Sequence, residues 1–152
     1  MLTLNDVSLS DNTANYNGGG IYNYDGIVTI NADSSLTGNT ANYGGGIYNT
    51  GNSGHHAGYG IVNLNGGSIT GNTANSIGGG LYSSDSWDFL GNPTTSVSFN
   101  GIGAAVKSNK ALLPSPTELS WYQGWGVYLK LGTPITTGGF DPATQVTDNT
   151  QI

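Results

Sequence analysis

The chain has 152 residues, a net charge of −6 and 26 glycines, and only 8% of its residues are charged. Aromatic residues reach 10%, which excludes disorder as the explanation of this composition, because disordered chains carry few of them. Three lysines and no arginine exclude a basic surface for nucleic acid, and no apolar run approaches the roughly 20 residues that membrane insertion as a helix needs.

Three short units open the chain and return later in the same order. They are LTLN (2–5), VSLS (7–10) and DNTANYNGGGIYNY (11–24). The second period repeats them as VTIN (28–31), SSLT (34–37) and GNTANYGGGIYNT (38–50). The third has VNLN (62–65), GSIT (67–70) and GNTANSIGGGLYSS (71–84), and VSFN (97–100) opens a fourth. The apolar stretches alternate with a period of two residues, which predicts three short strands per period, separated by Gly/Asn turns.

One such period is typical of one coil of a right-handed, single-stranded parallel β-helix, an all-β solenoid. A single coil cannot bury its apolar face, so coils must stack; we expect about four to five of them. Stacking places equivalent residues above one another at about 4.8 Å. The predicted interior columns are Leu2, Val28, Val62 and Val97; Leu4, Ile30, Leu64 and Phe99; Leu9, Leu36 and Ile69; Ala14, Ala41 and Ala74; and Ile21, Ile47 and Leu81.

Asparagine and glycine recur at the expected corners of the coil. The glycine triplets 18–20, 44–46 and 78–80 suit a tight bend. Asparagine tolerates left-handed backbone, and its amide can bond to the amide one coil away. Two asparagine ladders are predicted: Asn5, Asn31, Asn65 and Asn100; and Asn12, Asn39 and Asn72.

The repeat weakens after residue 100. We expect one domain over residues 1–152, with regular coils in 1–100, an insertion in 101–123, and a degenerate last coil with a C-terminal tail in 124–152. Within the insertion, Ser115-Pro116-Thr117-Glu118 has the form of a helix capping box, which predicts a short helix. GWGVY (124–128) matches GGGIY, and VTDNT (146–150) resembles the strand that runs into NTAN.

Two columns are expected to face outward. Tyr22, Tyr48, Tyr82 and Tyr128 follow interior residues, so alternation places them on the surface. Such a tyrosine stripe can bind sugars or a neighbouring protein, or it can stabilise the stack alone. A hydroxyl strip is also expected, formed by Ser10, Thr37 and Thr70 with Thr13, Thr40 and Thr73; it has the residue types of ice-binding β-helices.

The unit GNTAxxGGGIYN followed by a VxLN strand resembles β-helix repeats of large bacterial and archaeal surface proteins. It is similar to the repeats of chlamydial polymorphic outer membrane proteins, with their GGAI and FxxN motifs. Here GGGI stands at 18–21 and 44–47 and GGGL at 78–81, while NTAN replaces FxxN. The resemblance covers residues 1–84 better than 85–152. It implies a pectate-lyase-like superfamily fold, a surface location, an adhesive or structural role, and no catalytic residues.

The sequence contains few residues that could support enzymatic catalysis. Polysaccharide hydrolysis needs two facing carboxylates, and the closest pair is Asp85 and Asp88, beside Trp87. A loop turn explains these aspartates better. His55 and His56 are adjacent, so on an extended chain they point to opposite sides and form a poor chelate. We expect no enzyme activity, no catalytic or metal-binding residues and no cofactor.

The predicted function is that of an extracellular structural protein. Solenoids normally protect their terminal coils, and the sequence has no recognisable cap. We expect subunits that stack head-to-tail into a surface filament or sheath, with the chain itself as partner. The alternative is a repeat domain of a large cell-surface adhesin that binds glycans or other surface proteins; a polysaccharide-active enzyme is a third reading.

Overall fold

The computed structural model describes residues 1–52, 58–84, 90, 93–100, 104–111, 127–129, 135–138, 146–147 and 150–151. These residues contain strands and turns and no helix. The strands form four parallel sheets, named here A to D in the order in which the chain visits them. The predicted all-β class is therefore confirmed.

Each sheet takes its strands from successive coils, with at most one strand from each coil. Sheet A contains β1 (Leu2–Leu4), β4 (Ile27–Asn31), β8 (Gly60–Asn65), β12 (Thr95–Asn100) and β16 (Ile135–Gly138). Sheet B contains β2 (Ser8–Ser10), β5 (Ser35–Thr37), β9 (Ser68–Thr70), β13 (Ala105–Lys107) and β17 (Val146–Thr147). Sheet C contains β6 (Thr40–Tyr43), β10 (Thr73–Ile77), β14 (Lys110–Ala111) and β18 (Thr150–Gln151). Sheet D contains β3 (Ile21–Tyr24), β7 (Ile47–Thr50), β11 (Leu81–Ser83) and β15 (Val127–Leu129).

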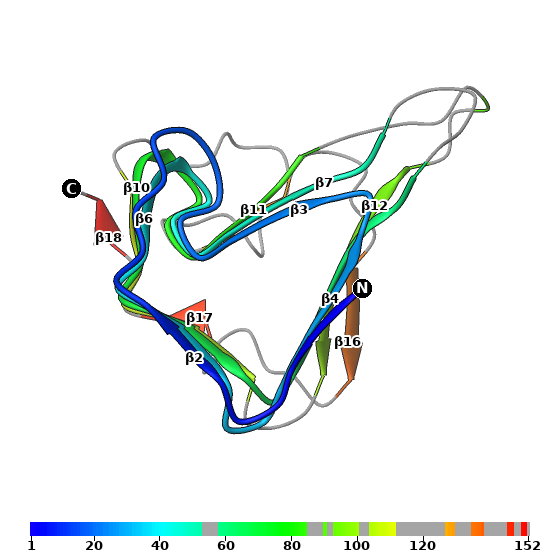
Figure 1. Ribbon diagram of the computed structural model, residues 1–152, viewed down its shortest axis with the longest axis horizontal. Coiled ribbons are helices and arrows are strands. Elements are labelled where there is room, and N and C mark those ends of the chain that lie inside the picture. Colours follow the sequence, from blue (N-terminus) through cyan, green and yellow to red (C-terminus); the bar gives the residue numbers. More distant parts are fainter. Residues whose placement is uncertain are drawn as a thin grey trace.

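The chain winds through sheets A, B, C and D and then returns to A one level further along the axis. Viewed down this axis, the coils superimpose on a roughly triangular outline, and the path runs clockwise as it recedes from its N-terminal coil (Figure 1). This is a right-handed parallel β-helix, as predicted. Coils begin at β1, β4, β8, β12 and β16, and the described part of the last one reaches β18.

The interior columns lie in register from coil to coil. Val28 pairs with Val62, and Val62 with Val97; their side chains are 2%, 0% and 0% exposed. The other columns are buried in the same way, and they hold Ile30, Leu64 and Phe99, and Ile21, Ile47 and Leu81. Leu2 pairs with Val28 as expected but is 41% exposed, because the structure describes no coil on its other side.

The NTAN segment differs from the prediction of three strands per period. It forms the strands of sheet C, so each complete coil from the second onward has four. Within it Ala41 and Ala74 are fully buried, while Thr40 and Thr73 face outward. This alternation is the strand pattern, and the asparagine just before each threonine occupies the corner. In the first coil, isolated bridges from Thr13 to Thr40 and from Asn17 to Tyr43 take the place of a sheet C strand.

The regular coils extend beyond residue 100, which corrects the start of the predicted insertion at 101–123. β13 pairs with β9 through Val106 and Ile69, and β14 pairs with β10 through Ala111 and Ala74. The missed signal is that Ser108-Asn109-Lys110-Ala111 matches GNTA with a serine for the glycine and a lysine for the threonine. The helix expected at 115–118 lies outside the described residues.

The glycine triplets form the corner between sheets C and D. The first glycine of each triplet has a positive φ, 63° at Gly18, 60° at Gly44 and 71° at Gly78, which glycine adopts without strain. The middle glycine lies against backbone of the next coil, because a Cβ on Gly45 would stand 2.4 Å from the carbonyl oxygens of both Gly79 and Thr73. A Cβ on Gly44 would meet Ile47 O, and a Cβ on Gly46 would stand 2.5 Å from Gly80 O, so backbone excludes a side chain at all three positions.

Candidate functional site

The tyrosine stripe lies on the outer face of sheet D. Tyr22 pairs with Tyr48, Tyr48 with Tyr82, and Tyr82 with Tyr128. The rings of Tyr22 and Tyr48 stack with centroids 5.4 Å apart and planes 9° from parallel. Those of Tyr48 and Tyr82 are 4.9 Å apart and 8° from parallel. The side chain of Tyr128 lies outside the described residues.

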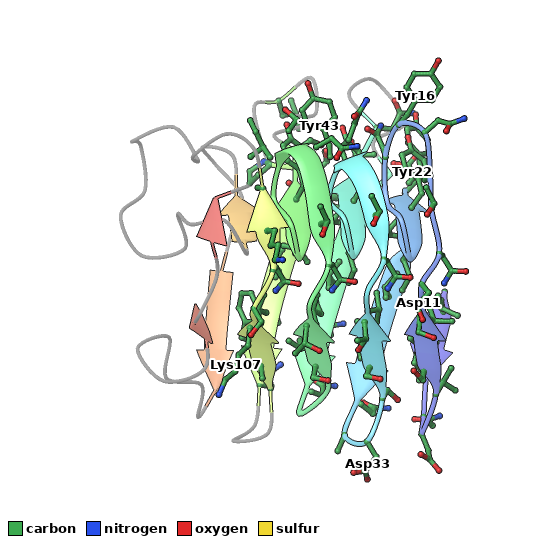
Figure 2. All side chains as sticks on the ribbon, turned by 90° about the vertical axis from the view of Figure 1, so that its left-hand side faces the viewer. Asp11, Tyr16, Tyr22, Asp33, Tyr43 and Lys107 are labelled. Atoms are coloured by element: carbon green, nitrogen blue, oxygen red, sulfur yellow. The ribbon has the colours of Figure 1, made fainter. Side chains whose placement is uncertain are left out.

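Further tyrosines extend this aromatic surface around the C–D corner. Tyr43, at the end of β6, meets Tyr82 edge-on with a centroid distance of 5.6 Å. Tyr16 is 77% exposed and precedes the first glycine triplet. Tyr16, Tyr22 and Tyr43 gather at one edge of the stack (Figure 2). Tyr16 and Tyr43 were not predicted as part of this surface, because neither belongs to the repeated GGGIY unit.

Stacking limits what the tyrosine stripe can bind. A sugar ring packs on the face of an aromatic ring, but the rings of Tyr48 and its two neighbours cover each other's faces. Tyr22 is covered on one side and is 53% exposed. The stripe therefore offers ring edges and phenol hydroxyls along its length, and an open ring face at Tyr22.

A buried asparagine ladder lies at the corner between sheets B and C. Asn72 Oδ1 accepts hydrogen bonds from the backbone N–H and the Nδ2 of Asn39, at 2.9 and 3.0 Å. Asn72 Nδ2 donates to Leu36 O and to Asn109 Oδ1, both at 3.0 Å. Asn12 bonds to Asn39 in the same way. Asn39, Asn72 and Asn109 are fully buried; Asn109 is a rung that was not predicted.

The second predicted ladder is exposed, at the corner that follows sheet A. Nδ2 of Asn31 donates to Asn5 Oδ1 at 2.6 Å. Asn65 bonds to Asn31 at 3.3 Å, and Asn100 to Asn65 at 3.1 Å. This ladder has no backbone N–H donors of the kind that fix the buried one, so it contributes less to the stack.

A third ladder was not predicted. Asn23 Nδ2 donates to Asn49 Oδ1 at 2.7 Å, and Asn49 Nδ2 donates to Ser83 Oγ at 3.1 Å. Each amide also donates to a backbone carbonyl at the turn into sheet A, Gly26 O at 2.8 Å and Gly60 O at 2.9 Å. The signal was available, because alternation from the interior Ile21 and Ile47 places the residue two positions later inward.

The hydroxyl strip is wider than predicted. Ser10, Thr37 and Thr70 are in register on sheet B, and Thr13, Thr40 and Thr73 are in register along sheet C. Ser8, Ser35 and Ser68 form a third column beside them. In the fourth coil Ala105, Lys107 and Lys110 take these positions. Two lysines thus end the strip (Lys107 in Figure 2), and no more than three coils carry an uninterrupted hydroxyl array.

The residues considered for catalysis or metal binding lie outside the described part of the chain. These are Asp85, Trp87 and Asp88, and His55 and His56. Within the described residues, no three His, Cys, Asp or Glu side chains come close enough to hold a metal ion. Those residues also include no helix with the length and apolar character needed to cross a membrane.

The family comparison matches the segments that run from sheet B to sheet D in the first two coils. A family model described as the Chlamydia polymorphic membrane protein repeat matches residues 6–24 and 33–50. Both segments contain a ladder asparagine, Asn12 or Asn39, a glycine triplet and a stacked tyrosine. The first two coils are similar to the repeats of that family. The resemblance expected from GGGI and NTAN is therefore confirmed. No curated protein and no solved structure matches the chain.

Proposed function

We propose that this chain is a structural module of a cell surface, which extends by stacking coil on coil with further copies of itself. The resemblance to the chlamydial membrane-protein repeat supports the surface location. A surface built from neutral polar side chains, with 8% charged residues, suits an extracellular scaffold that presents no charged binding site. Protease shaving or antibody labelling of cells that express the chain tests whether it lies at their outer surface.

One observation carries the stacking proposal. All four sheets are parallel, and sheets A, B and D start with a strand of the first coil. Sheets A, B and C end with a strand of the last coil, β16, β17 and β18. Among the described residues, sheets A and B therefore have unpaired outer strands of the same direction at both ends of the stack. Open edges of this kind template association, and a contact of this type that does not close forms a filament.

The edge of the first coil is also apolar. Leu2 and Val7 are 41% and 36% exposed there. Both would be covered by a further coil, which would remove their apolar surface from water. Burying such surface contributes about 25 cal/mol per Å².

Sedimentation velocity over a range of concentrations tests the stacking proposal. We expect concentration-dependent oligomers that L2K abolishes, because the lysine places a charge where the next coil must dock. I27K is the matched control: Ile27 is 38% exposed but lies on the lateral face of β4, so assembly should persist. Circular dichroism would establish that both variants fold. A wild-type chain that stays monomeric at high concentration would contradict the proposal.

Binding of glycans or proteins is the second candidate, and the exposed tyrosines favour it. The open ring face of Tyr22 and the edge of the stacked rings would form the contact. Glycan-array binding that is lost in Y22S and retained in Y59S would support this role; Tyr59 is similarly exposed, at 51% against 53%. Equal binding by both variants, or none by the wild type, would exclude it.

A further inference from the structure

The two buried ladders give the stack a direction. In both of them the side-chain amide of one coil donates to the side-chain oxygen of the following coil. Backbone groups fix this orientation. The N–H of Asn39 requires an acceptor, so Asn72 must turn Oδ1 toward it. Asn23 Nδ2 likewise donates to Gly26 O, which also accepts the backbone N–H of Ile61.

The first coil therefore carries acceptors that no described residue fills. Asn39 Oδ1 and Asn72 Oδ1 each accept one backbone N–H and one amide N–H from the coil before. No donor among the described residues reaches Asn12 Oδ1 or Asn23 Oδ1. Asn23 is 6% exposed, and Asn12 is an exposed residue. Leaving such an acceptor unpaired once it is buried costs about 1–3 kcal/mol.

We propose that the first coil binds the last coil of a second copy in one direction and one register. The acceptor Asn12 Oδ1 selects both the direction and the register. This inference rests on the stacking proposed above. The partner must bring a backbone N–H and an amide to Asn12. Thr150 pairs with Lys110, and in the sequence Asn149 precedes Thr150 as Asn109 precedes Lys110. By this sequence correspondence, Asn149 is the residue of a second copy that we expect to supply the donors.

The same acceptors disfavour a head-to-head contact. A copy that presented its own first coil would bring acceptors rather than donors to Asn12, and its strands would run antiparallel to β1 and β2. The parallel pairing that joins all coils within the chain would then end at the interface. Head-to-tail docking continues this established interface, with Thr3 following Thr136 as Thr136 follows Ser98 in sheet A.

Site-specific cross-linking tests the direction in which two copies dock. The chain has no cysteine, so each introduced cysteine is the single reactive thiol. We expect a short bismaleimide to give covalent dimers when T3C and T136C are mixed, and none with either variant alone. Dimers from T3C alone would reveal head-to-head docking and overturn the inference while leaving association itself intact. A wild-type chain that is monomeric at every concentration would instead remove the stacking proposal together with this inference.

The role of Asn12 has its own test. N12A should weaken association about tenfold, the effect of losing about 1.4 kcal/mol, because the partner's donors lose their acceptor. N15A is the matched control: Asn15 is exposed in the same coil and lies outside the ladders. The two variants should have similar unfolding midpoints, since Asn12 makes a single side-chain donation within the chain. Unchanged association in N12A would overturn the assignment.

Discussion

At the residue scale, the buried asparagines hold this fold together at positions where most proteins place apolar side chains. Burying an amide without partners costs free energy, but Asn72 accepts two hydrogen bonds and donates two from its side chain. The ladder therefore satisfies corner groups of the backbone that would otherwise be buried without a partner. It also ties each coil to the coils before and after it.

Replacing a rung by an acid tests this role. N72D keeps the size but loses both Nδ2 donations, and it buries a carboxylate beside Leu36 O and Asn109 Oδ1. We expect a loss of at least about 3 kcal/mol in the free energy of unfolding, since each lost partner leaves a buried group unsatisfied at about 1–3 kcal/mol. N65D, on the exposed ladder, should cost less than about 1 kcal/mol. Urea denaturation measures both, and equal losses would contradict the distinction.

The middle glycine of a triplet gives a second residue-scale prediction. G45A places a methyl group 2.4 Å from two carbonyl oxygens of the next coil, so backbone must move and we expect a loss of several kcal/mol, above the usual range of about 0.5–3 for single mutations. Gly71 has a φ of 64° but nothing closer to its Cβ position than Gly38 N at 4.0 Å. Asp11 and Ser108 occupy the equivalent place with φ of 57° and 55°, so G71S should cost at most about 1–2 kcal/mol. Thermal unfolding of G45A and G71S measures both losses in stability, and the loss in G45A should be the larger.

At the element scale, the sheets are short, and their stability comes from repetition along the axis. Sheet D illustrates this, because its outer face carries one continuous stack of tyrosines. Such pairs contribute about 0.5–1.5 kcal/mol each beyond the area they bury. The stack is therefore a stabilising element in its own right, whatever it binds.

Removing the central ring tests the contribution of the stack. Y48A loses contacts to both Tyr22 and Tyr82, so we expect a loss of about 1–3 kcal/mol in unfolding free energy. Y24A is the control on β3: Tyr24 is 54% exposed and takes part in none of these ring contacts. Its loss should be below about 0.5 kcal/mol. Similar losses in chemical denaturation would show that the stacked rings do not stabilise the fold.

Much of this element structure follows from the sequence. Exact repetition predicts the register, and alternation predicts the interior columns Val28–Val62–Val97 and Ile21–Ile47–Leu81. Sheet C was missed because β6, β10 and β14 each contain a single buried apolar side chain, an alanine such as Ala41, which is too weak a pattern beside polar neighbours. Residues 105–111 were missed because Lys110 replaces the threonine of GNTA. The direction of the ladders could not be predicted, since it depends on which backbone groups lie beside each amide.

At the scale of the whole molecule, the described strands form one stack of coils along a single axis. Coils superimpose along one axis (Figure 1), and the described coils stand side by side in a row (Figure 2). The described lateral faces carry hydroxyl and amide side chains, exposed tyrosines and few charges. At the first coil, Leu2 and Val7 are exposed, and no described residue pairs with its outer strand edges or with Asn12 Oδ1. Growth along the axis, rather than lateral association, is the mode of assembly that these features favour.

Cryo-electron microscopy of the concentrated chain tests this account most directly. We predict unbranched filaments one β-helix wide, with coils about 4.8 Å apart and each subunit adding about 24 Å along the axis for its five coils. Isolated particles at every concentration, or subunits that meet through their lateral faces, would contradict it.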